Sequence, residues 1–234
     1  VIEQIKDRLM RNIIKPGYKL PSELELCAQL GVSRGSVRSA MKVFETLGVI
    51  DIRVGDGTYV RDSISSQNLN PLIFSLLILK PGFHDIVQFR EKLELDIVDL
   101  IIKDEQLTAQ AVPKLEENLK NLYFLQQTNA SPEAFFESDQ EFHSILAKGC
   151  NNIIFETVYR YIFEFFSFEI LYSHMKQSYG SVAANDHTRI YQAIKSQDFS
   201  MAKEAIHGSA TSWVELTKNA PPDELQAKSL WFKT

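Results

Sequence analysis

Two side chains in the second half of the chain have the types and spacing of metal ligands. Asp139 and His143 are four residues apart, so in a helix they lie on one face, where a carboxylate and an imidazole can share a cation. His187 lies on the apolar face of another predicted helix, and Arg90 and Glu94 repeat the four-residue spacing on a third. Taken alone, the Asp-x-x-x-His pattern also fits an exposed ion pair that stabilises a helix, so both interpretations stay open.

A second group of residues, near the N-terminus, has the types that read DNA. Arg34 and Arg38 share a helix face, and an arginine can bind guanine O6 and N7 with two hydrogen bonds. Ser33 and Ser36 can reach phosphates, and Gly35 allows a close approach to the backbone of DNA. We therefore expect this segment to contact the major groove.

The elements around these arginines predict a helix-turn-helix. Ser22 and Glu25 have the spacing of a capping box, which starts one helix, and Gly31 ends it. Ser33 caps the next helix, which ends at Gly48. Two short helices joined by such a turn are typical of DNA-binding domains, in which the second helix enters the major groove.

A strand pair follows the two helices. Residues 49–53 and 58–61 are rich in β-branched and aromatic residues, and the turn between them contains an Asp-Gly pair, a strong hairpin signal. Gly55 and Gly57 let this turn approach the DNA backbone or minor groove, with Arg53 beside it. A helix-turn-helix with such a hairpin is a winged helix.

The rest of the chain predicts a helical bundle. We expect a winged-helix domain in residues 1–62, a polar linker in 63–70, a helical effector-binding and dimerisation domain in 71–220 and a tail in 221–234. The fold class is mainly α, with an antiparallel bundle of six or seven helices because the connections are short. The expected helices are 71–80, 84–103, 108–128, 131–149, 151–178, 183–196 and 199–218. Aromatic residues surround the fifth of them and are expected to be mostly core or dimer interface.

Composition restricts the class of protein. Cys27 and Cys150 are the two cysteines of the 234 residues, which excludes a disulfide-built secreted scaffold and fits the cytoplasm. We expect no membrane span, since no apolar run approaches the roughly 20 residues a span needs, and no signal segment. Taken over the whole chain, the net charge of −5 argues against a nucleic-acid partner, but the charge is not evenly distributed. Residues 1–62 carry 10 basic and 8 acidic side chains, so the acidic excess belongs to the helical part.

The N-terminal motifs resemble those of the GntR family of transcription regulators. The matching segments are Leu20–Glu23, Leu30–Arg34 and Gly55–Val60. The resemblance implies a winged helix that binds double-stranded DNA, and a palindromic operator read by a homodimer. The family usually has an arginine that contacts DNA where this chain has Leu24, so Arg34 and Arg38 are expected to carry more of the readout.

The C-terminal segments resemble the helical domain of the FadR subfamily. In its metal-containing branch, an Asp and three His side chains bind a divalent ion, and the ion and a nearby arginine hold a small carboxylate effector. By position, the resemblance makes Asp139, His143 and His187 ligands of a zinc- or nickel-like ion and Arg90 the effector-binding arginine.

The fourth ligand position is Ser209, which could hydrogen-bond a bound water or an effector oxygen. His207 lies two residues earlier, about 200° away around a helix, so it cannot replace the missing ligand. His174 has no positional match. Three outcomes stay open: a three-ligand site completed by water or effector, a weakened site, or a metal-free pocket.

These features predict a ligand-responsive transcription regulator and not an enzyme. We expect a cytoplasmic homodimeric repressor that responds to a small organic acid. One alternative is a regulator for which the metal itself is the effector. Another alternative is a metal-dependent hydrolase. The sequence shows no convincing general base or nucleophile to accompany Asp139, His143 and His187, which argues against this alternative.

Overall fold

The structure, a computed structural model, describes residues 1–62, 71–165 and 179–217. These residues are mainly helical and include one two-stranded sheet, which confirms the predicted fold class. Contacts divide the chain into two compact units, Val1–Ile78 and Leu79–Thr234. The predicted linker and tail, 63–70 and 221–234, lie outside the described residues, and the domain boundaries stay a prediction.

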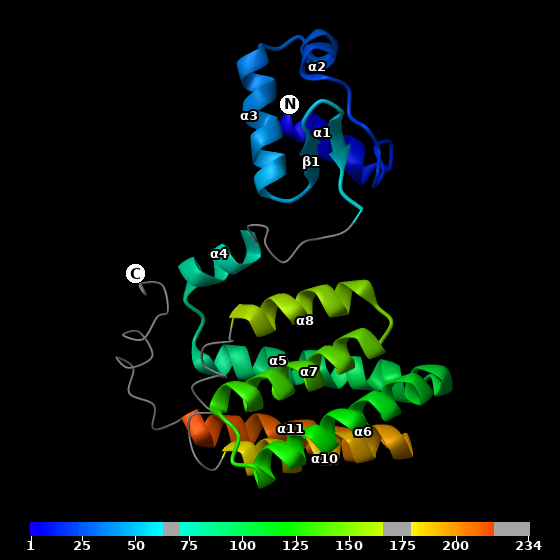
Figure 1. Ribbon diagram of the computed structural model, residues 1–234, viewed down its shortest axis with the longest axis vertical. Coiled ribbons are helices and arrows are strands. Elements are labelled where there is room, and N and C mark those ends of the chain that lie inside the picture. Colours follow the sequence, from blue (N-terminus) through cyan, green and yellow to red (C-terminus); the bar gives the residue numbers. More distant parts are fainter. Residues whose placement is uncertain (63–70, 166–178, 218–234) are drawn as a thin grey trace. The chain divides into compact units, whose positions relative to one another are not determined.

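The N-terminal unit contains the expected helix-turn-helix (Figure 1). Its helices are α1 (Ile2–Met10), α2 (Glu23–Leu30) and α3 (Arg34–Thr46). The Ser22 hydroxyl accepts a hydrogen bond from the Glu25 amide at 3.3 Å, and the Glu25 carboxylate accepts one from the Ser22 amide at 2.8 Å. Gly31 ends α2 in the left-handed conformation, with φ of 65°. The capping box and the turn glycine thus fix where α2 begins and ends.

The strands β1 (Ile50–Arg53) and β2 (Gly57–Val60) form the antiparallel wing hairpin. Ile50 pairs with Val60 and Arg53 with Gly57. Gly55 and Gly57 have φ of 79° and 149°, a region that disfavours other residues. The turn between the strands therefore depends on both glycines. The core of this unit consists of Ile5, Ile14, Leu20, Leu26, Val37, Ala40, Met41, Phe44, Ile50 and Val60.

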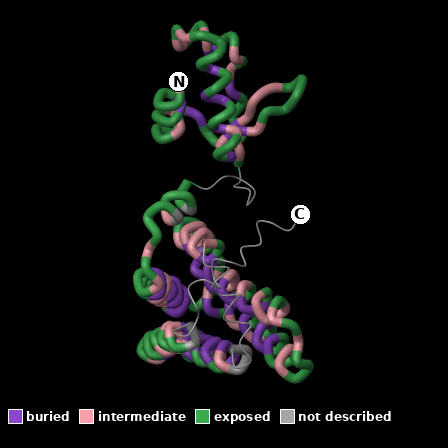
Figure 2. The backbone as a smooth tube through the Cα atoms, turned by 90° about the vertical axis from the view of Figure 1, so that its left-hand side faces the viewer, coloured by how far each residue is buried: buried purple, intermediate pink, exposed green. Residues whose placement is uncertain are grey.

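Seven helices follow among the described residues. They are α4 (Pro71–Leu79), α5 (Phe83–Ile102), α6 (Glu105–Gln127), α7 (Pro132–Gly149), α8 (Ile153–Phe165), α10 (Tyr179–Ser196) and α11 (Phe199–Thr217). Helix α10 packs against α11 and α6, α11 packs against α5, and α7 packs against α6 and α8. Helices α5, α6, α7, α8, α10 and α11 form a bundle in the second unit, and their inward faces are buried (Figure 2), whereas α4 up to Ile78 belongs to the first unit.

Two helix starts differ from the sequence expectation by three residues or more. Helix α6 begins at Glu105 because Asp104 caps it, accepting hydrogen bonds from the amides of Gln106 and Leu107. Thr108, the expected start, is buried within α6. Helix α10 already includes Tyr179 and Gly180, where the sequence suggested a connection.

The bundle core is apolar except for a small set of polar residues. Glu94, Asp139, His143 and His187 are each at least 97% buried. Burying charged or polar side chains costs free energy unless they are paired or bind a ligand, so this cluster marks the candidate site. Within the described residues, no helix has the length and apolar character that a membrane crossing requires.

Candidate metal and effector site

The three expected ligands converge in the bundle. Asp139 and His143 lie one turn apart on the buried face of α7, and His187 faces them from α10. His187 Nε2 lies 3.3 Å from Asp139 Oδ1, and His143 Nε2 lies 3.9 Å from the same oxygen. One donor atom from each residue lies within 4.8 Å of the other two. A single cation could therefore contact all three side chains.

A carboxylate and a phenol hold the far side of the His143 ring. Its Nδ1 lies 2.9 Å from Glu94 Oε1 and 2.8 Å from the Tyr159 hydroxyl, and that hydroxyl also donates to Glu94. Because a carboxylate only accepts hydrogen bonds, the ring proton lies on Nδ1. The lone pair of Nε2 therefore points away from Glu94, as in metal sites where a carboxylate orients a histidine ligand.

Arg90 lies between Glu94 and His143. Its Nε donates to Glu94 Oε1 at 3.1 Å, and its Nη2 donates to His143 Nε2 at 2.7 Å. The guanidinium carbon lies 5.0 Å from the centre of the Trp213 ring and 5.9 Å from that of Phe163. Arg90 thus contacts both the imidazole and the carboxylate that orients it.

The charges of this network keep its protons in place. Burial alone would raise the pKa of Glu94, but Arg90 and His143 hold that pKa well below its ordinary value. Burial and the charge of Glu94 raise the pKa of Tyr159 well above its ordinary value, so the phenol keeps its proton and donates it. Burial lowers the pKa of His187, although Asp139 acts in the opposite direction. The lowered value favours the neutral imidazole that a metal ion requires.

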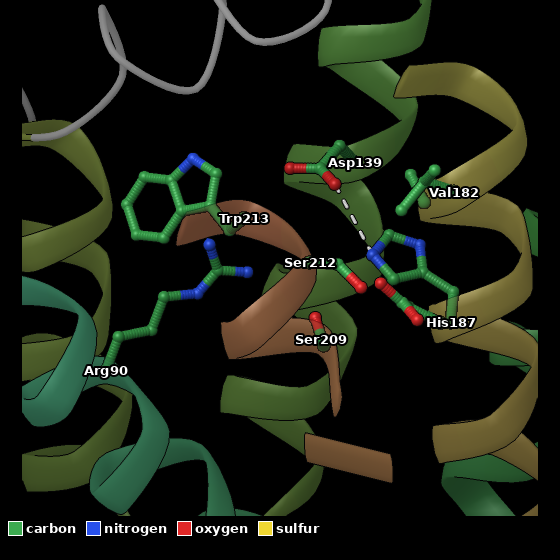
Figure 3. A pocket seen from close by; sticks show the side chains of 9 residues that line it. Arg90, Asp139, Val182, His187, Ser209, Ser212 and Trp213 are labelled. Atoms are coloured by element: carbon green, nitrogen blue, oxygen red, sulfur yellow. Dashed lines mark ion pairs between the residues drawn. The ribbon is translucent and has the colours of Figure 1, made fainter. Parts of the chain in front are cut away.

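Ser209 lies at the cavity beside these residues. The lining includes Arg90, Asp139, His187, Ser209 and Trp213, and Figure 3 shows Arg90 and Trp213 on one side and His187 on the other. The cavity volume is about 10 Å³, which accommodates one water-sized sphere. An ion fits this space, whereas an organic acid requires side chains to move.

The other two histidines considered as ligands do not contribute. The His207 side chain is exposed, and its Nδ1 lies 3.2 Å from Glu91 Oε1, as expected for a position on another face of α11. His174 lies outside the described residues.

The donor set fits a borderline divalent ion such as zinc. Two imidazole nitrogens and one carboxylate oxygen converge, the arrangement of many three-ligand sites with an open position. His187 Nε2 lies 3.3 Å from Asp139 Oδ1 and can donate its proton to that carboxylate. A cation bound between them would take the place of this proton, which would then lie on Nδ1, an atom that has no hydrogen-bond partner in the described part of the chain.

Sequence reasoning missed two residues of the site. Tyr159 belongs to an aromatic run that covers all sides of its helix, so no periodicity distinguished it from core residues. Asn118 on α6 donates to the Ser138 carbonyl and to Glu141 Oε2, both at 3.0 Å, and so fixes α7 next to Asp139. Nothing in its spacing indicated that role.

The expected DNA-reading residues are exposed on α3. Arg34 and Arg38 are exposed, whereas Val37 on the same helix is fully buried. Arg38 Nη2 donates to Glu23 Oε2 on α2 at 3.1 Å, an exposed ion pair that DNA can replace. DNA contact by these arginines stays a prediction.

The two serines at the start of α3 are engaged with each other. Ser33 Oγ accepts a hydrogen bond from the Ser36 amide at 3.1 Å and lies 2.9 Å from Ser36 Oγ. Both hydroxyls remain on the exposed surface. Leu24, where the resemblance expects arginine, is 59% exposed on α2.

The wing carries both basic and acidic side chains, which pair with one another. Arg53 pairs with Asp51 and lies over the Tyr59 ring, 4.3 Å from its centre, while Lys19 pairs with Asp56. Gly57 lies against Lys19, where an added Cβ would come within 2.6 Å of the lysine side chain. Gly55 has open space instead, so its role is conformational.

Family models match both parts of the chain. The model described as bacterial regulatory proteins, gntR family, matches residues 1–60, and that of the FCD domain matches residues 85–209. The chain belongs to the GntR family. The combination of these two domains is the hallmark of its FadR-like subfamily.

Relatives of this GntR-family chain are similar over most of their length. The HTH-type transcriptional regulator YcbG of Bacillus subtilis is 30% identical over 204 residues, which cover 85% of this chain and 80% of that protein. A putative L-lactate dehydrogenase operon regulatory protein of Escherichia coli is 26% identical over 214 residues, covering 88% and 80%. The solved structure of a GntR protein from Streptococcus agalactiae superposes with a TM-score of 0.62 at 27% identity, covering 91% and 98%.

The family assigns the general function. Its members and these relatives are DNA-binding transcription regulators and not enzymes, which confirms the corresponding expectations and excludes the hydrolase alternative. The GntR-family chain pairs a DNA-binding unit with an FCD domain, whose cluster of Asp139, His143 and His187 is a possible metal site.

Proposed function

We propose that this GntR-family chain acts in the cytoplasm as a homodimeric repressor that senses a small carboxylate with the help of a divalent metal ion. Arg34 and Arg38 read operator bases, Ser33 and Ser36 contact phosphates, and the wing residues Arg53, Gly55 and Gly57 approach the DNA backbone. Two winged helices read the two halves of a palindromic operator.

Asp139, His143 and His187 would hold the ion, which is zinc- or nickel-like in view of its nitrogen and oxygen donors. The ion supplies a Lewis-acidic contact for a carboxylate oxygen. Arg90 supplies a second, charge-assisted contact, and Ser209 a hydroxyl at the same cavity. Trp213 holds the Arg90 guanidinium at the cavity wall.

The observation that carries this proposal is the convergence of three buried donors within 4.8 Å beside an arginine whose side chain is mostly buried. A buried cluster with this composition is costly to keep without a ligand. Two neutral imidazoles and one carboxylate give a divalent ion the partners that make burial of all three side chains favourable.

Metal content tests the site directly. Protein purified without chelators is expected to contain about one zinc or nickel ion per chain by elemental analysis. Asp139→Asn and His187→Gln should lose it, whereas Asp186→Asn, a change at a carboxylate that lines the same cavity, should retain it. Wild-type protein without bound metal, even after incubation with zinc, would contradict the metal site.

The cavity volume favours a second candidate function. About 10 Å³ suits an ion but no organic acid, so the ion itself could be the effector. Operator binding measured with zinc alone distinguishes the two. A large change in affinity without any acid favours metal sensing, whereas a change that requires a carboxylate favours the first proposal.

A further inference from the structure

Arg90 contacts the nitrogen that a metal ion would need. His143 Nδ1 is held by Glu94, so Nε2 is the atom of this ring that can bind an ion. Arg90 Nη2 donates to that same Nε2 at 2.7 Å. A guanidinium has no acceptor, so its N–H takes the Nε2 lone pair. One lone pair cannot serve an N–H donor and a metal ion at once.

We infer that Arg90 competes with the divalent ion for His143 Nε2, and that the displaced guanidinium is the group that binds the carboxylate. This inference rests on the proposed function, because it assigns an order of binding at the same site. The ion binds first and thereby makes Arg90 available to the carboxylate. An arginine that served only as an anchor for the acid would not affect metal binding.

The guanidinium of Arg90 is planar and rigid, so its nitrogens move together. In the structure its Nε bonds to Glu94 at 3.1 Å and the group lies over Trp213 at 5.0 Å. Rotation about the side-chain bonds before Nε would turn the whole guanidinium away from both His143 and Glu94 and toward the cavity that Ser209 and Asp139 also line.

The small cavity supports the same order. With Arg90 on His143, the space is about 10 Å³, too little for a carboxylic acid. A guanidinium released from His143 changes the shape of this cavity and offers two parallel N–H donors, the geometry that a carboxylate prefers. Metal and acid should then bind cooperatively.

Metal affinity tests the competition. Arg90→Met keeps a long side chain against Trp213 but removes every N–H donor, so zinc should bind about tenfold or more tightly than to the wild type, measured against a chromogenic chelator. The control is Arg189→Met, which removes an equal charge from an exposed arginine of α10 and should change zinc affinity less than about threefold.

Trp213 gives a second measurement that needs no substitution at Arg90. The chain has two tryptophans, so in a Trp231→Phe background the fluorescence reports Trp213 alone. Zinc without acid should change this fluorescence as Arg90 moves. The change should vanish when Arg90→Met is added.

The outcomes separate this inference from the proposed function. Equal zinc affinity of wild type and Arg90→Met, or zinc saturation of the wild type without a change in Trp213 fluorescence, overturns the competition and leaves the metal site intact. The absence of zinc binding in both proteins overturns the competition and the metal-assisted function together.

Discussion

The ring of Phe142 stacks face to face on that of His187, with centres 3.8 Å apart and planes 3° from parallel. Phe142 is fully buried on α7 and lies in sequence between Asp139 and His143, the two proposed ligands of this helix. The stack fixes the plane of the His187 ring and therefore the direction of its Nε2. A core side chain thus also positions a residue of the proposed metal site.

Phe142→Ala should lower the free energy of unfolding by about 3–5 kcal/mol, because it opens a cavity in the core. It should also weaken zinc binding, since His187 loses the ring that orients it. Leu146→Ala is the matched control: it removes an equally buried apolar side chain one turn along α7. Urea unfolding and zinc competition check both effects, and equal zinc affinity in the two variants would show that the stack only fills space.

Glu94→Gln should destabilise the protein by about 3 kcal/mol near neutral pH, because it removes one partner from a buried ionic network. The pKa of Glu94 in the folded protein lies below its ordinary value of 4.5. Below that pH the unfolded chain takes up a proton at Glu94 while the folded chain does not, so the stabilising contribution decreases as the pH falls.

Urea unfolding between pH 7 and pH 3 checks this dependence. The difference in stability between wild type and Glu94→Gln should narrow on acidification. Glu91→Gln, on the same helix but at a partly exposed carboxylate, should differ little from the wild type at any pH. A difference between wild type and Glu94→Gln that stays constant below pH 4.5 would contradict the assignment of Glu94 as a buried carboxylate.

Ser209→His should strengthen zinc binding by about tenfold or more, equivalent to about 1.4 kcal/mol, by adding a ligand at the cavity shared with Asp139 and His187. His207→Ala removes an exposed imidazole two residues away and should leave zinc affinity unchanged. Competition with a chelator measures both. Unchanged affinity in Ser209→His would place residue 209 outside the coordination sphere.

Arg38→Ala should weaken operator binding by about tenfold to a hundredfold, the value of one bidentate base contact. It should also relax the preference at one base pair of each half-site, because Arg38 is exposed on the face of α3 that we propose to read the groove. Selection from randomised duplexes measures the preference, and Arg11→Ala is the control at an exposed arginine after α1. Equal losses on all DNA sequences would indicate a phosphate contact only.

Thermal stability of Arg38→Ala should change little, since the ion pair of Arg38 with Glu23 is exposed.

Local signals predicted the N-terminal unit well. The capping box of Ser22 and Glu25, the left-handed Gly31 and the Ser33 cap each depend on residues close in sequence, so their spacing was sufficient. The predicted start of α6 was wrong because two residues close in sequence could each cap this helix. Asp104 competed with Thr108 as the cap, and its carboxylate accepts from two amides.

The site could be predicted only in part. Asp139 and His143 share a helix turn, and the resemblance placed His187 with them. The contact between Arg90 and His143 joins residues 53 positions apart, and that between Tyr159 and Glu94 joins residues 65 apart. Such contacts depend on how α5, α7 and α8 pack, which helical periodicity does not specify.

Operator binding by the full chain, measured with and without zinc across a panel of small carboxylates, tests the central claim most directly. The account predicts that one acid changes operator affinity by about tenfold or more when zinc is present, that chelation abolishes this response, and that Asp139→Asn lacks it. A full response to an acid in chelated protein, or in Asp139→Asn, would contradict metal-assisted carboxylate sensing.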